Sequence, residues 1–325
     1  MNPDEFKTHI LKNFREYKNL YCFYKEIGGN ENLTDDVLRY EYSDNPDRGN
    51  LIYATQQSRI IGAIGTIGFQ LLKDGLPLKS TLLDRVLIAR WFWGKDLFKK
   101  LEEIAFNIAH NNEVHFLWGL TPVPKSFVKL GYTTHTAISL LILENIQLIS
   151  HIVAIENIQI KYGFDDDIVT LNQKISDAYP DQYFLCCNQK KYNWLVSNNK
   201  HLDRYCVRIY RNSDLIAFII LRIEKWRDTL SIEALMINDN ENIETVAHIA
   251  RNEAIKNNLP KISITLNSKN ILLKRVEDIF LSLGFKSFPY NANLITKAVN
   301  KDIHVAQLYL TGIWAPPYWA APIKK

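Results

Sequence analysis

One segment largely determines the predicted fold: residues 83–101, which read LDRVLIARWFWGKDLFKKL. Its first part belongs to an apolar run from Thr81 to Ala89 that is typical of a buried strand. Gly94-Lys95 ends this run, and apolar residues then return at helical spacing, at Leu97, Leu101, Ile104, Ala105 and Ile108. The segment therefore predicts a strand, a loop that contains a glycine, and an amphipathic helix.

A second segment, residues 118–132 (WGLTPVPKSFVKLGY), continues the pattern. Val114 to Trp118 predicts a strand, and Pro124 to Leu130 predicts a short helix that Gly131 closes. We expect a strand over Ala137 to Leu143 to complete this half of the chain.

Upstream, aromatic and aliphatic residues recur every three or four positions between Phe6 and Tyr24. This spacing predicts one N-terminal helix that starts near Asn2-Pro3-Asp4. Two strands, 51–54 and 59–72, follow it. Gly62, Gly65 and Gly68 fall within the second strand, where glycine indicates a bulge or a close approach.

The same order of elements recurs in the second half of the chain. The elements that match the first set are a hairpin over 205–221, a strand over 230–237, a helix over 243–255, a strand over 261–265, a helix over 276–283 and a strand from Leu294. Such a repeat predicts two copies of one fold. The length agrees, because 325 residues exceed one ordinary domain.

Together, residues 83–101 and 118–132 resemble the acyl-CoA-binding strand–loop–helix, and the strand–helix after it, of the GNAT acetyltransferases. The run Arg39-Tyr40-Glu41-Tyr42, with Asn45-Pro46 and Gly49, is similar to the start of the tandem-GNAT proteins found in bacterial surface-polysaccharide gene clusters. The resemblance implies an α+β fold of two GNAT-like modules, each a mixed, mostly antiparallel sheet flanked by helices. We expect the modules to span residues 1–146 and 147–325.

The resemblance also implies an acyl-CoA site in the first module. The residues that it places there are the backbone of Val86, Leu87 and Ile88 and the loop Trp93, Gly94, Lys95, Asp96, Leu97 and Phe98. Family loops of this type are rich in glycine and carry an arginine, so that backbone N–H groups reach the CoA pyrophosphate at the helix N-terminus. Here Trp93 replaces the arginine and Asp96 replaces a glycine. A loop that merely caps its helix is the alternative.

The matching loop of the second half, residues 238–242 (NDNEN), holds two acids and neither a glycine nor a basic residue. We expect that copy to be structural or to face the substrate.

Two catalytic candidates follow from the resemblance. Asp84 is the best carboxylate for a general base, with a structural ion pair as the alternative. Phe127 stands where the family often has a tyrosine acid, so Tyr132 is the remaining tyrosine of the motif; a core aromatic is its alternative.

The leading hypothesis is an enzyme, an N-acyltransferase that uses acetyl-CoA or another acyl-CoA as co-substrate. By resemblance its acceptor is an amino group of a sugar or small metabolite of polysaccharide synthesis. Two alternatives stay open: a non-catalytic tandem-GNAT binding protein, and an acyltransferase whose donor is an acyl carrier protein or an aminoacyl-tRNA.

The composition limits the classes of partner that we expect for the protein. A formal net charge of +4, with basic residues adjoining only in pairs such as Lys190-Lys191, argues against nucleic acid, and we interpret these pairs as solvated. The four cysteines form no CxxC, so we expect neither a metal site nor disulfides, and a cytoplasmic protein. Polar residues interrupt the stretch 137–160, which argues against a membrane span. The aromatic, proline-rich tail 314–322 is expected to pack against the body or a partner.

Overall fold

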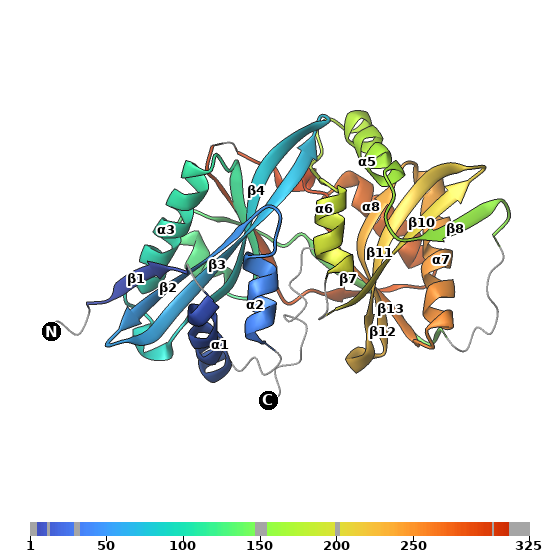
Figure 1. The fold of residues 1–325 in the computed structure, drawn as a ribbon. Coiled ribbons are helices and arrows are strands. Elements are labelled where there is room, and N and C mark those ends of the chain that lie inside the picture. Colours follow the sequence, from blue (N-terminus) through green and yellow to red (C-terminus); the bar gives the residue numbers. More distant parts are fainter. Residues whose placement is uncertain are drawn as a thin grey trace.

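The computed structural model describes residues 5–11, 14–28, 33–146, 155–198, 202–300 and 302–311. These form two modules that lie side by side, each with one sheet and its own helices (Figure 1). The α+β class with two GNAT-like modules is confirmed. The tail 314–322 lies outside the described residues, so its packing stays a prediction.

In the described residues the first sheet has eight strands, in the order β1-β2-β3-β4-β5-β15-β6, with β9 beside β3. Only β4 and β5 run parallel. The strands are β1 (Lys7–Ile10), β2 (Gly49–Gln56), β3 (Arg59–Lys73), β4 (Leu76–Ile88), β5 (Phe116–Thr121), β6 (Thr133–His135), β9 (Phe184–Leu185) and β15 (Asn293–Ala298). The helices of this module are α1 (Phe14–Gly28), α2 (Asp35–Tyr42), α3 (Leu97–Asn111) and α4 (Pro124–Val128).

The second sheet repeats this plan with seven strands among the described residues, in the order β8-β10-β11-β12-β13-β7-β14. Again one central pair, β12 with β13, is parallel. The strands are β7 (Ile138–Leu143), β8 (Ile158–Tyr162), β10 (Asp203–Arg211), β11 (Asp214–Glu224), β12 (Thr229–Ile237), β13 (Lys261–Asn267) and β14 (Lys286–Pro289). The helices are α5 (Asp167–Ala178), α6 (Gln189–Tyr192), α7 (Ile243–Lys256) and α8 (Ile271–Ser282).

The sheet of each module contains a strand from the other half of the chain, and the first sheet also contains the two-residue β9 beside β3. β7 pairs with β13 and β14 in the second sheet, and β15 pairs with β5 and β6 in the first. Strands were expected at both places, but each in the sheet of its own half, and that expectation is wrong. Because side-chain alternation fixes which face of a strand is buried and not its neighbour, local sequence does not reveal the exchange. The predicted division of the chain into modules of residues 1–146 and 147–325 stays a prediction.

The N-terminus also differs from its prediction. Residues 7–10 are not helical; they form β1, an edge strand against β2, and the helix starts only at Phe14. His9 secures the strand, because its Nε2 lies 2.9 Å from Thr55 Oγ1 and its ring stacks on Tyr53 at 4.9 Å. Ladder hydrogen bonds with β2 therefore outweigh the helical spacing.

One hydrophobic core runs through both modules, from Leu20 and Leu38 beside the first sheet to Val207 in the second. The rings of Tyr40 and Trp194 stack at 5.3 Å across the junction, and the Tyr40 hydroxyl donates to the Trp194 carbonyl at 2.6 Å. Lys191, predicted to be solvated, is buried, and its Nζ lies 2.6 Å from Asp47 Oδ2. That prediction is wrong because the Lys191 ammonium is held by a carboxylate of the other module and by the rings of Phe69 and Trp194.

Within the described residues, no helix is both long and apolar enough to span a bilayer.

Candidate active site

In the first module the two parallel central strands separate at their C-terminal ends. The β4–β5 ladder joins Ser80–Leu82 to Phe116–Trp118, and β4 then continues to Ile88 and β5 to Thr121 with no further ladder pair between them in the described residues. Two strands that part in this way leave the β5-facing edge of β4 without ladder partners over residues 83–88, and we call this region the gap. Val86, Leu87 and Ile88 are half-buried there, so the structure brings these three predicted site residues to the gap.

The loop 93–98 lies at the end of this gap and leads into the 15-residue helix α3. Gly94 has φ +79°, and no atom lies within 4 Å of the position that a Cβ would take. Asp96 occupies the N-cap position without a side-chain capping hydrogen bond, while Leu97 is fully buried and anchors the helix. The loop thus presents a positive helix end and open space beside a glycine, which are two features of an anion site.

Trp93 partly closes the same place. Its side chain is 66% exposed, yet its indole Nε1 donates to the Ile88 carbonyl at 2.9 Å. One backbone acceptor of the gap is therefore already occupied. Phe98, the last residue of the predicted loop, packs edge-on against Phe127 at 5.0 Å, so Phe127 belongs to the core of this site.

Asp84 lies behind the gap and is fully buried. Its Oδ2 accepts a hydrogen bond from the Tyr42 hydroxyl at 3.2 Å and lies 3.5 Å from Arg85 Nε. Arg85 also makes two bonds of 2.6 Å to the carboxylate of Glu41. Gly65 allows this arrangement, because a Cβ there would stand 2.0 Å from the Tyr42 hydroxyl. The Tyr42 side chain, and not a ligand, therefore occupies the space beside Gly65.

Arg85 owes its position to a β-bulge. The β3–β4 register shifts between Ala63 and Gly65, and Arg85 takes φ +49°. The Tyr24 hydroxyl donates to the Arg85 carbonyl at 2.8 Å. Burial raises the pKa of Glu41, and the Arg85 guanidinium opposes that rise. Glu41, Asp84 and Arg85 thus form a buried, ion-paired cluster.

Tyr132 is buried too, away from the gap. Its hydroxyl donates to Glu102 Oε1 at 2.9 Å, and Lys297 from the exchanged strand β15 reaches the same oxygen at 2.8 Å. Burial first, and then Glu102, raise the pKa of Tyr132 well above its usual value. The hydroxyl therefore keeps its proton and its hydrogen bond to Glu102 in this structure.

The sequence analysis missed a second set of buried charges, which lies in the other module. Glu233 contacts Arg204 and, at 3.1 Å, Arg222, which also contacts Glu224. Arg204 lies close enough to Glu41 to lower its pKa, so the charges of the two modules are linked. Charged residues inside otherwise apolar strands were the available signal, since such residues are buried only when they are paired.

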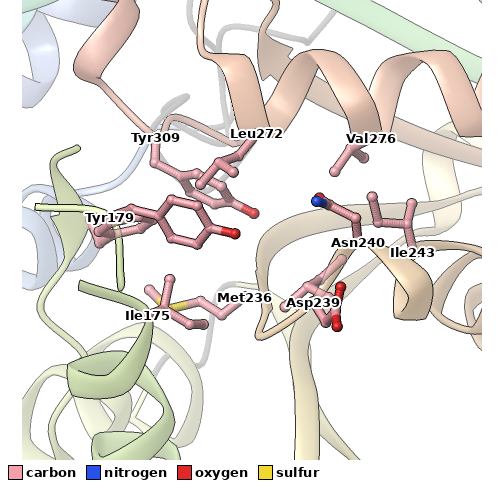
Figure 2. Close-up of a pocket in the computed structure, with 11 residues that line it drawn as sticks. Ile175, Tyr179, Met236, Asp239, Asn240, Ile243, Leu272, Val276 and Tyr309 are labelled. Carbon is pink, nitrogen blue, oxygen red and sulfur yellow. The ribbon is translucent and has the colours of Figure 1, made fainter. Parts of the chain in front are cut away.

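The second module has a pocket at the end of its own parallel strand pair, β12 and β13. We call it the second-module pocket. The β12–β13 ladder ends at Ile232 and Ile264, and the pocket lies beyond it, at the start of α7. Figure 2 shows its lining, which is mainly apolar and comprises Ile175, Tyr179, Phe184, Met236, Ile237, Asp239, Asn240, Ile243, Leu272, Val276 and Tyr309. Lysine, arginine and histidine are absent from these lining residues. The lining therefore offers no cation to a pyrophosphate.

These features define a class: the described chain has a tandem GNAT-type fold, with a gap between β4 and β5 at the helix end of the first module. Solved structures share the fold. A protein of Enterococcus faecalis described as a probable N-acyltransferase matches with a TM-score of 0.66 and 10% identity over 91% of this chain and 73% of its own. A tandem GNAT protein from the clavulanic acid biosynthesis pathway matches with a TM-score of 0.63 and 11% identity, over 92% and 100%.

A third similar structure is a glucosamine N-acetyltransferase region of a fungal multi-domain β-N-acetylglucosaminidase. Its TM-score is 0.64 and its identity 13%, over 91% of this chain and 38% of its own. No protein-family model matches the sequence, and no curated protein does. In the described residues, no group of three or more His, Cys, Asp or Glu side chains is placed to hold a metal ion. All four cysteines are free thiols.

Proposed function

We propose that the protein is an acyl-CoA-dependent N-acyltransferase whose donor site is the β4–β5 gap of the first module. The parting of the two parallel strands carries the proposal, because it leaves the backbone of Val86 and Leu87 without a ladder partner from β5, beside a helix N-terminus. An extended chain with amide groups fits such an edge by adding to it as a strand would. Gly94 and the start of α3 would then take the pyrophosphate, with Lys95 as the cation of the loop.

In the reaction, the acceptor nitrogen forms a bond to the thioester carbonyl carbon and the C–S bond breaks. The ammonium proton leaves to water, and the thiolate receives a proton. Asp84 and Tyr132 hold the surrounding structure and do not face the reacting atoms, since both are buried and bonded to other side chains. The proposed catalysis therefore depends mainly on positioning the two reactants.

We propose a small-molecule amine as the acceptor, with an amino sugar as the leading class. The resemblance to tandem-GNAT proteins of polysaccharide gene clusters supports this class, and so does the fold shared with a glucosamine N-acetyltransferase region. The acyl group is proposed to be acetyl.

Asp96 provides the test. A carboxylate about 6 Å from a doubly charged pyrophosphate disfavours it by about 1–2 kcal/mol where water screens the two groups. Asp96→Asn should therefore tighten acetyl-CoA binding in calorimetry about 5- to 30-fold. Glu103→Gln is the matched control, because it removes the same charge from an exposed position further along α3 and should leave the affinity unchanged.

Two outcomes would decide against the proposal. Unchanged or weaker acetyl-CoA binding by Asp96→Asn would contradict the placement of the pyrophosphate beside Asp96. No binding of acetyl-CoA at millimolar concentration would favour the second candidate, a tandem-GNAT protein that uses another donor or only binds. The hydrogen bond from Trp93 to Ile88 is the observation on the side of that candidate.

A further inference from the structure

The second-module pocket contains three polar groups that converge on an apolar space. Figure 2 shows the rings of Tyr179 and Tyr309 side by side, with their hydroxyls directed toward the middle of the pocket and the amide of Asn240 facing them. Neither hydroxyl, nor the Asn240 side chain, has a hydrogen-bond partner in the part of the chain that the structure describes. Tyr309 is only 7% exposed, and its hydroxyl points into the pocket, where a ligand can accept a hydrogen bond from it.

The charges of the pocket argue against anionic ligands. Its lining holds no cationic side chain, and Asp239 stands at its edge with Oδ1 accepting from the Glu241 backbone N–H. A phosphate or carboxylate would meet a negative charge and gain no ion pair. Burial, and next Tyr179, raise the pKa of Tyr309, so this phenol keeps its proton and remains a donor. Two phenol hydroxyls and the Asn240 amide N–H thus offer donors to a single acceptor.

The pocket is also separate from the proposed donor site. The β3–β4 turn contacts α5, since Gly75 N–H donates to Ser176 Oγ at 3.1 Å, and α5 supplies Tyr179 and Ile175 to the pocket. Trp93 and Gly94 follow the other end of β4, which spans 13 residues, or about 40 Å. A molecule in the pocket therefore does not take part in chemistry at the β4–β5 gap.

We propose that the second-module pocket binds a small neutral carbonyl compound, such as an amide, through Tyr179, Tyr309 and Asn240. The carbonyl oxygen accepts from these donors, and a short alkyl group packs against Leu272, Val276 and Met236. An apolar cavity with a few convergent polar groups is the usual form of a small-molecule site. The empty space of the pocket is about 370 Å³ and includes open solvent at its mouth.

Met236 makes the proposal directly testable. The sequence has two methionines, Met1 and Met236, so a protein labelled with ¹³C-methyl methionine gives two signals, one from the pocket. The probe is N-butylacetamide, with hexanoate as an anionic and hexylammonium as a cationic counterpart of similar length. We expect N-butylacetamide to shift the Met236 signal saturably and the two charged probes to bind at least tenfold more weakly.

Two variants test the donors. Tyr309→Phe and Tyr179→Phe should each weaken N-butylacetamide about three- to tenfold, as expected for one hydrogen bond. Tyr162→Phe, on the exposed face of β8, is the control and should bind as the wild type does. If Tyr309→Phe fails to fold, Tyr179→Phe still decides the question, because its side chain lies at the rim of the same pocket.

The proposal is overturned if N-butylacetamide does not shift Met236, if hexanoate or hexylammonium binds as well, or if a folded Tyr→Phe variant keeps full affinity. Acetyl-CoA should leave the Met236 signal unchanged, because its proposed site is in the first module. Failure at the pocket and failure of the acyltransferase proposal are therefore observed separately.

Discussion

Arg85→Met tests whether the charge cluster behind the β4–β5 gap holds the first module together. Arg85 makes two bonds of 2.6 Å to Glu41 and lies 3.5 Å from Asp84, and all three side chains are at most 6% exposed. The methionine leaves two buried carboxylates without their cation. Removing one partner of a buried ion pair costs about 3–5 kcal/mol. Urea unfolding at pH 7, followed by circular dichroism, should show a loss of that size.

The stability loss of Arg85→Met should depend on pH through the pKa of Glu41. Burial raises the pKa of Glu41 and Arg85 opposes the rise, so in Arg85→Met the folded-state pKa moves further above the unfolded value. A raised pKa gives stability that is present below the unfolded pKa and is lost as the pH rises through the folded one. The deficit of the variant should therefore shrink from pH 7 to pH 5, and Glu41→Gln in the same background should recover part of it. A deficit under 1 kcal/mol, or one equal at both pH values, would refute the reasoning.

Three further predictions concern the same framework. Fragments 1–146 and 155–311 should each be insoluble alone, because each lacks one exchanged strand, and should form a soluble complex on co-expression; a folded 1–146 alone, seen by NMR, would contradict the exchange. Tyr132→Phe should lower the free energy of unfolding by about 1–2 kcal/mol through the lost bond to Glu102, whereas a large loss of acyl transfer at unchanged stability would make the hydroxyl catalytic. Gly65→Ala should destabilise by about 1–3 kcal/mol in urea unfolding, since its Cβ displaces the Tyr42 hydroxyl, and an unchanged midpoint would show that the site relaxes freely.

Local pattern was enough to predict the element that positions the candidate site. In residues 83–101 the apolar run, the glycine and the helical spacing of Leu97 and Leu101 each carry their own signal, and the structure has β4, the loop and α3 there. The repeat of this order in the second half likewise predicted two modules of one fold, and the structure has two sheets with one central parallel strand pair in each.

Contacts between distant segments were beyond such reasoning. β7 and β15 read as ordinary strands, and only pairing across the whole chain assigns each to the sheet of the other half. Lys191 looks like a surface residue until Asp47 of the other module lies against it. The second-module pocket depends on Tyr179 and Tyr309, which are far apart in sequence from Asn240.

The central claim is that an acyl-CoA binds the first module in the gap between β4 and β5. Hydrogen–deuterium exchange with and without saturating acetyl-CoA tests it most directly, because the backbone groups of the gap are the proposed contacts. The account predicts slower exchange in peptides that cover residues 83–98, and unchanged exchange in residues 233–246 of the second module. Protection confined to residues 233–246, or no protection anywhere, would contradict it.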